Sequence, residues 1–214
     1  MMRTVVLKVD PQNPDAETMK RAGEAIRAGG LVAFPTETVY GLAADAFNPA
    51  AVARVFEVKG RSPGNPLPVQ VSSEEDIRKI AASVPEVARR LMAAFFPGPL
   101  TLVMPANPGL PEIVTAGSGK VGIRMPNHPI ALSLIEAAGT PIVAPSANIS
   151  GEPPPITADE VLAYLEGRIE LVLDAGPTML KVASTVIDVT ITPPVILRLG
   201  SIGEKAIRRH LRDV

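Results

Sequence analysis

Apolar residues recur along this chain at helical spacing in some stretches and in short continuous runs in others. Residues 15–28 carry apolar side chains every three or four positions, which predicts a helix. The pair Gly29-Gly30 follows directly and suits a left-handed helix end. The apolar run at residues 31–34 then predicts a buried strand. This alternation of helical and strand-like stretches continues to the end of the chain.

Polar capping residues mark where the other helices are expected to begin. Asn48 stands before Pro49, and Ser73 precedes a stretch of helical spacing. Three Ser/Thr–Glu pairs have the spacing of a capping box: Ser83 with Glu86, Thr157 with Glu160 and Ser201 with Glu204. A further helix is expected over residues 130–138. The remaining expected strands are residues 67–71, 100–104, 121–125, 141–144, 170–173, 185–189 and 195–199.

The order of these elements predicts one α/β domain around a large mixed sheet, covering residues 1–214. No repeat and no linker long enough to divide the chain is present in the sequence. A chain of 214 residues with 46% hydrophobic and 20% charged residues has enough apolar content for a core. These proportions exclude a disordered protein.

The charge balance and the rare residue types narrow the function. A net charge of -1 argues against a protein that coats nucleic acid, although a local basic cleft is compatible with it. The absence of Cys excludes disulfides and thiolate metal sites, and the two histidines, His128 and His210, argue against a transition-metal centre. The charged N-terminal start and the lack of long apolar runs predict a cytoplasmic protein without a membrane segment.

Several well-known catalytic motifs do not fit. The segment 116–120, AGSGK, resembles the end of a phosphate-binding loop, but that motif would need Gly and Ser or Thr where the chain has Val114 and Val121. No G-x-G-x-x-G follows a predicted strand, and Ser146 lacks the glycines of a nucleophile elbow. A site in this chain must therefore use cations, hydroxyls, amides and backbone groups.

Such groups occur in blocks that lie near predicted strand ends. The segment 59–67, KGRSPGNPL, places two cations on a loop framed by Gly and Pro. Other blocks are FPTETVYGL (34–42), IRMP (123–126) and APSAN (144–148), with Ser184, Thr185 and Arg198 further on. Taken singly, each block is explained by a surface loop, a capped turn or an ion pair. Their conjunction at the ends of strands of one sheet favours a single ligand cleft.

The sequences FPTETVYGL, KGRSPGNPL, IRMPNHP, APSAN and STVID, in this order, resemble the YrdC/TsaC-type threonylcarbamoyl-AMP synthase family over about residues 30–200. The resemblance implies an open, twisted α/β sheet with a concave, positively charged face. It implies the condensation of L-threonine, bicarbonate and ATP into threonylcarbamoyl-AMP and pyrophosphate. A separate transferase would move the threonylcarbamoyl group to tRNA. Since the chain ends soon after Arg198, it resembles the single-domain form of the family.

The resemblance also assigns roles to individual residues. The family's signature, Lys-x-Arg followed by Ser-x-Asn, matches four residues expected to be catalytic: Lys59, Arg61, Ser146 and Asn148. Those expected to bind ATP are Arg61, Asn65, Lys120, Ser146 and Arg198, and those expected to bind threonine are Thr38, Gln70, Arg124, Ala144 and Ser184. Lys59 is expected at the phosphates or the carbamate, and Arg124 at the threonine carboxylate. No protein metal site is expected, and Mg²⁺ is the default ion for ATP.

Two positions depart from the family pattern. Gln70 stands where relatives often have His, and Ala183 replaces a common Glu before Ser184. A step that needs His at position 70 is therefore not expected here.

Two other classes of function remain open. One is an RNA-binding module with a concave basic face, which the net charge and the 3% aromatic content disfavour, because readers of single-stranded RNA stack bases on aromatic rings. The other is a small-molecule carbamoyl or phosphate enzyme on the same fold. The sequence leaves open whether tRNA or a transferase binds directly, and it leaves the oligomeric state open too.

Overall fold

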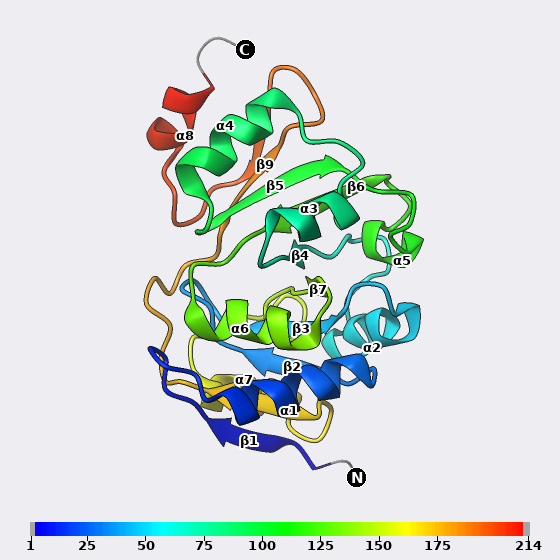
Figure 1. Cartoon of the computed structure of the whole chain (residues 1–214), viewed down its shortest axis with the longest axis vertical. Coiled ribbons are helices and arrows are strands. Elements are labelled where there is room, and N and C mark those ends of the chain that lie inside the picture. The colour runs from blue at the N-terminus through cyan, green and yellow to red at the C-terminus, as the bar shows by residue number, and fades with distance from the viewer. Residues whose placement is uncertain (1–2, 212–214) are drawn as a thin grey trace.

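A computed structural model describes residues 3–211, and in it ten strands form one open, mixed sheet (Figure 1). The order across the sheet is β1-β8-β2-β3-β7-β4-β6-β5-β9-β10. The strands are β1 (Val5–Lys8), β2 (Val32–Phe34), β3 (Gly41–Asp45), β4 (Val69–Gln70), β5 (Leu100–Pro105), β6 (Lys120–Arg124), β7 (Ile142–Val143), β8 (Leu171–Asp174), β9 (Thr185–Asp188) and β10 (Val195–Arg198). The mixed α/β sheet expected from the sequence is confirmed.

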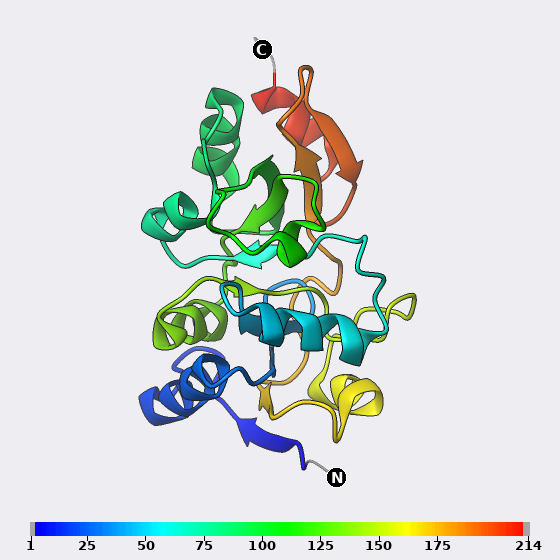
Figure 2. The same cartoon turned by 90° about the vertical axis from the view of Figure 1, so that its right-hand side faces the viewer.

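The helices in the described residues are α1 (Ala16–Arg27), α2 (Pro49–Lys59), α3 (Glu74–Ile80), α4 (Glu86–Phe95), α5 (Glu112–Thr115), α6 (Pro129–Ala138), α7 (Ala158–Leu165) and α8 (Glu204–His210). Figure 2 shows α1, α6, α3 and α4 on one side of the sheet, with α2 and α7 on the other side. No helix in residues 3–211 is long and apolar enough to cross a membrane.

The sheet pairs in both senses. Parallel pairs join β1 to β8, β2 to β8, β4 to β6 and β5 to β9. The remaining neighbours, among them β5 with β6 and β9 with β10, are antiparallel. Parallel neighbours need crossovers, and these carry the helices that cover the sheet faces.

Side-chain alternation along β6 separates the core from the site. Val121 and Ile123 are buried in the main hydrophobic core. Lys120, Gly122 and Arg124 line cavities instead. Because successive side chains of a strand point to opposite faces, the cavities lie on the face of β6 opposite to that core. The neighbouring β5 repeats the pattern, with core residues alternating with polar or partly exposed ones.

Three expected helix starts agree with the structure. The side chain of Asn48 accepts hydrogen bonds from the backbone N–H groups of Ala50 and Ala51, at 3.1 and 3.2 Å. The hydroxyl of Thr157 accepts one from Glu160 N–H at 3.2 Å. Ser73 likewise caps α3.

Two expected caps are wrong. Helix α4 begins after Pro85 and has no side-chain cap. The residue before a proline avoids helical geometry, so Val84 cannot belong to a helix that starts at Ser83. Helix α8 begins after Gly203, also without a side-chain cap. The Ser201 hydroxyl instead donates to the carbonyl oxygens of Val182 and Ala183, at 2.9 and 3.2 Å.

Three elements were not expected from the sequence: β1, β3 and α5. Strand β3 carries Gly, Ala and Asp, which are not typical of strands, and it is almost fully buried. It pairs with β2 on one side and β7 on the other, so its neighbours rather than its composition make it a strand.

Candidate active site

Most of the polar residues selected from the sequence surround a cavity of about 270 Å³ on the cleft face of the sheet. They come from the segments after β2, α2 and β7, from β4 and β6, from the residue before β9, and from the end of β10. The expected site residues that line it are Thr38, Arg61, Gln70, Arg124, Ala144, Ser146, Asn148, Ser184 and Arg198. Lys59 and Asn65 do not line it.

Arg124 lies at one end of this cavity and is held by three groups. Its Nε donates to the carbonyl oxygen of Gly98 at 3.2 Å, and its Nη1 donates to the Thr38 hydroxyl at 2.9 Å. Its Nη2 lies 2.8 Å from the Glu37 carboxylate, as a buried ion pair. With 6% of its surface exposed, the guanidinium is fixed before any ligand binds, which suits bidentate pairing with a carboxylate.

Glu37 is buried against Arg124, and the half-buried His128 lies close enough to Glu37 to be affected by its charge. Neither oxygen of Glu37 accepts a well-aligned hydrogen bond within residues 3–211, so the contact with Arg124 is mainly one of charge. Burial lowers the pKa of His128, and the nearby Glu37 opposes this shift. The imidazole is therefore neutral at pH 7.

Gln70 adds an unpaired acceptor to the same end. Its side chain is 3% exposed, and its Oε1 has no hydrogen-bond partner among the described residues. Gln70 on β4 is the register partner of Arg124 on β6, so the two side chains share one face of the sheet. An unpaired buried acceptor is costly unless a ligand donates to it. Ala144, whose N–H donates to Pro68, contributes shape rather than a free polar group.

Ser184 connects this end of the cavity to the other cations. Its hydroxyl lies 2.8 Å from the Thr101 hydroxyl. Arg198 donates to the Ser184 carbonyl oxygen at 2.9 Å and to its hydroxyl at 3.2 Å. The sequence analysis did not predict Thr101 as a site residue. Thr101 is the one polar residue in the apolar strand β5, and this contrast could have indicated its place in the site.

Arg61 and Arg198 carry positive charge that no carboxylate balances. Arg61 donates to the carbonyl oxygens of Asn65 and Pro66, at 3.1 and 2.9 Å. Neither guanidinium forms an ion pair within residues 3–211, whereas Arg124 does. Burial lowers the pKa of both Arg61 and Arg198, and Arg124 adds to the shift at Arg198. This part of the cleft therefore carries positive charge that an anionic ligand can balance.

Lys59 lies beneath the cavity wall rather than in the cavity. Its ammonium, 2% exposed, donates to the carbonyl oxygens of Ser146 and Asn148 at 2.5 and 2.6 Å, and to Asn148 Oδ1 at 3.3 Å. Burial, with a smaller contribution from Arg61, lowers the pKa of Lys59 to about 8. In this structure the N–H donors of Lys59 bind the Ser146–Asn148 loop and do not point into the cavity. The expected contact of Lys59 with phosphates or carbamate would therefore require these bonds to change.

The Ser146–Asn148 loop is further fixed from within. The Ser146 hydroxyl donates to Asn148 Oδ1 at 2.5 Å. The Asn148 amide donates to the carbonyl oxygens of Ile149 and Glu152, at 2.9 and 2.6 Å. The two halves of the expected signature, Lys-x-Arg and Ser-x-Asn, therefore meet through Lys59.

An adjoining cavity of about 410 Å³ extends the cleft and shares Arg61, Thr101, Ser184 and Arg198 with the first. These shared residues form the junction between the two cavities. Lys120 lines it and forms an ion pair with Asp188 at 3.0 Å. Burial acts to raise the pKa of Asp188, but hydrogen bonds from Thr190 and Lys120 outweigh it and lower the pKa. The apolar part of the lining includes Leu67, Val103, Val186 and Leu197. Asn65 is exposed and lines neither cavity; its backbone carbonyl holds Arg61.

Comparisons with known proteins show which proteins this chain resembles. The Sua5/YciO/YrdC family profile, described as telomere recombination, matches residues 24–200. A threonylcarbamoyl-AMP synthase of Pyrococcus abyssi is 46% identical over 211 residues, which are 99% of this chain and 62% of the relative. This chain therefore spans less than two thirds of that relative's length.

Solved structures with the same fold are also similar. The crystal structure of P. abyssi Sua5 complexed with L-threonine matches with a TM-score of 0.95 at 45% identity, covering 99% of this chain and 62% of that one. Escherichia coli YciO matches with a TM-score of 0.86 at 26% identity, covering 95% of this chain and 98% of that one.

Proposed function

This chain belongs to the Sua5/YciO/YrdC family, and on that premise we propose that it is a threonylcarbamoyl-AMP synthase. It condenses L-threonine, bicarbonate and ATP, and it releases pyrophosphate. The observation that carries the proposal is the charge arrangement of the cleft. Arg124 is held as a fork at one end, while Arg61 and Arg198 lie at the junction without a carboxylate partner.

Threonine occupies the smaller cavity in this proposal. Its carboxylate pairs with Arg124, and its polar groups meet Gln70 Oε1, Thr38 and Ser184. A site that bonds the substrate hydroxyl rejects analogues without it, because its own buried polar groups would then be unpaired. The crystal structure of the P. abyssi relative in complex with L-threonine supports this choice of amino acid.

ATP occupies the larger cavity. Its apolar walls suit the purine ring, and Lys120, Arg61 and Arg198 face the phosphates. Residues 3–211 hold no cluster of three or more His, Asp or Glu side chains that could cage a metal ion. Mg²⁺ would therefore be bound mainly through the ATP phosphates and water, and Asp188 is the one carboxylate among the residues that line this cavity.

The chemistry needs positioning rather than a nucleophilic side chain. The threonine amine adds to bicarbonate, which loses water and leaves a carbamate. A carbamate oxygen then attacks the α-phosphorus of ATP, and pyrophosphate departs with its electron pair. Arg61 and Arg198 offset the mutual repulsion of these anions and the charge that develops on pyrophosphate. The fixed Ser146–Asn148 loop keeps the reacting groups in register.

We place the reaction in the cytoplasm. The product is a mixed anhydride that a transferase must consume, moving the threonylcarbamoyl group to a tRNA adenosine. Whether that transferase or tRNA contacts this chain is not needed for the chemistry of the cleft.

The test is an omission assay on the pure protein with labelled ATP. Pyrophosphate release should require threonine and bicarbonate together. Arg61→Ala should reduce the release at least a hundredfold, because it removes an unbalanced cation from the junction, a loss of roughly 3 kcal/mol. Arg21→Ala on α1 is the matched control and should leave the rate unchanged. Tight tRNA binding without any turnover would contradict the proposal and favour an RNA-binding module.

A further inference from the structure

A separate cavity of about 470 Å³ lies on the opposite face of the sheet, between α3 and α4. Figures 1 and 2 show these helices side by side on the face that lies away from α2 and α7. The cavity is lined by one turn of each helix, with Ile77 and Arg78 from α3 and Arg89 and Met92 from α4. Its size falls in the range of pockets that hold small organic ligands.

The floor of this cavity is apolar. Ile77 is 2% exposed, and Val84, Met92, Phe96 and Met125 are partly buried against the main core. These side chains still face the cavity, so apolar surface is left for a ligand to cover.

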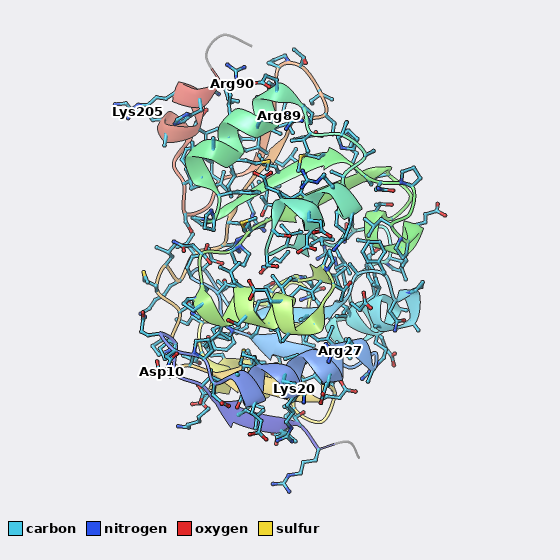
Figure 3. The ribbon with its side chains drawn as sticks, in the orientation of Figure 1. Asp10, Lys20, Arg27, Arg89, Arg90 and Lys205 are labelled. Atoms are coloured by element: carbon cyan, nitrogen blue, oxygen red, sulfur yellow. The ribbon has the colours of Figure 1, made fainter. Side chains whose placement is uncertain are left out.

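The rim of the cavity carries an excess of positive charge. Arg78 and Arg89 are exposed, and neither forms an ion pair within the described residues. Figure 3 shows Arg89 on α4, among the charged side chains of the outer helical layer. Glu74 is the one carboxylate in the lining, so two guanidinium groups face one negative charge. The remaining unit of charge suits one anionic group.

The cavity also touches the segments that hold Arg124. Met125 follows Arg124 directly, and Phe96 stands two residues before Gly98. The Gly98 carbonyl oxygen accepts from Arg124 Nε at 3.2 Å, and the Gly98 N–H donates to the Met125 carbonyl oxygen at 2.8 Å. A ligand that contacts Phe96 and Met125 thus acts on both sides of the Gly98–Arg124 contact.

We propose that this cavity is a second ligand site, which takes a small amphipathic monocarboxylate and is coupled to the amino-acid end of the cleft. The apolar body of the ligand covers Phe96 and Met125, and its carboxylate pairs with Arg78 and Arg89. The coupling step rests on the proposed function, because its readout is threonine affinity. The binding step does not.

The experiment titrates the full chain with 4-phenylbutyrate, and with the neutral 4-phenylbutanol as a matched probe, by calorimetry. The carboxylate should bind saturably, and the alcohol roughly tenfold or more weakly, because it lacks the charge that the arginines recognise. Arg89→Met should weaken the binding of 4-phenylbutyrate by a similar factor. Ala93→Trp should fill the cavity and abolish binding, whereas Ala94→Trp, on the same exposed helix but outside the lining, should not.

Saturation with 4-phenylbutyrate should also change the dissociation constant for threonine about fivefold or more. Equal binding of the two probes, or carboxylate binding that persists in Ala93→Trp, would overturn the site. Unchanged threonine affinity at saturation would overturn the coupling. A protein that binds no threonine would refute the proposed function, while the probe titration would still decide the second cavity.

Discussion

The cations of the cleft differ in which groups accept their hydrogen bonds. Lys59 donates to the Ser146–Asn148 loop, and Arg124 is paired with Glu37. Arg61 and Arg198 donate to neutral oxygens alone. All three N–H donors of Lys59 are used by oxygens of this loop, whereas Arg124 has five donors and three contacts, and Arg61 and Arg198 have no counter-charge. Lys59 therefore positions the loop, and we propose that Arg61 contacts the substrate.

The depressed pKa of Lys59 leads to a prediction about stability. Its pKa falls from 10.5 to about 8 on folding, so below pH 8 the folded state bears the full cost of the buried charge. As the pH rises from about 8 towards 10.5, the folded state releases its proton first, and this cost is relieved. Raising the pH from 7 to 9.5 should stabilise the wild type relative to Lys59→Met by roughly 1–2 kcal/mol.

Urea unfolding of both proteins at the two pH values measures this difference, because all other titrating groups are common to the pair. Lys59→Met should also lose most of its turnover at pH 7, since the Ser146 and Asn148 carbonyl oxygens are left unpaired. A stability difference that does not change with pH would show that folding does not lower the pKa of Lys59.

The sequence identified the types of group in the cleft better than their contacts. The Lys-x-Arg and Ser-x-Asn segments were found, but the contact of Lys59 with the carbonyl oxygens of Ser146 and Asn148 spans 87 and 89 positions of the chain. Thr101 was missed for a related reason. Its role depends on Ser184 from a neighbouring strand, and no local pattern shows which strands become neighbours.

Helices α1 and α6 approach each other closely at Gly23. A Cβ built there would lie 2.4 Å from the Ala137 carbonyl oxygen and 2.8 Å from the Ala138 nitrogen, both of them backbone atoms. Backbone cannot move aside as a side chain does, so the close approach of these helices depends on glycine. The pair covers the strands β2 and β3, away from the lining of the cleft.

We therefore expect Gly23→Ala to lower the free energy of unfolding by roughly 1–3 kcal/mol, despite the better helix propensity of Ala. The rate of pyrophosphate release should remain within twofold of the wild type. Gly203→Ala is the control, because its Cβ would meet nothing within 4 Å. Chemical denaturation of the three proteins checks the prediction, and an undiminished stability of Gly23→Ala would refute the packing argument.

Helix starts show where sequence patterns succeed and fail. Asn48 and Thr157 cap their helices because each is followed by residues free to turn helical. Ser83 fails because Pro85 delays the helix, and Ser201 fails because its hydroxyl bonds the segment before β9. The first failure could have been predicted from the proline. The second required the position of a segment nearly twenty residues away.

In the whole molecule, part of the sheet packs against helices on one face and holds the cleft on the other. In its β4-β6-β5 region, α3 and α4 cover one face while the cleft occupies the other. The chain carries a net charge of -1, yet four cations line the cleft: Arg61, Lys120, Arg124 and Arg198. Composition alone could not show this, because the positive charge is concentrated by folding.

We propose that one cleft holds the amino acid at Arg124 and the nucleotide at Lys120. The most direct measurement is the pair of KM values, for threonine and for ATP, in Arg124→Lys and Lys120→Met. Arg124→Lys should raise the threonine KM about tenfold or more and leave the ATP KM within about twofold, because lysine cannot form the fork. Lys120→Met should do the reverse. If either variant changes both KM values equally, or if Arg124→Lys leaves the threonine KM unchanged, the two-ended cleft is contradicted.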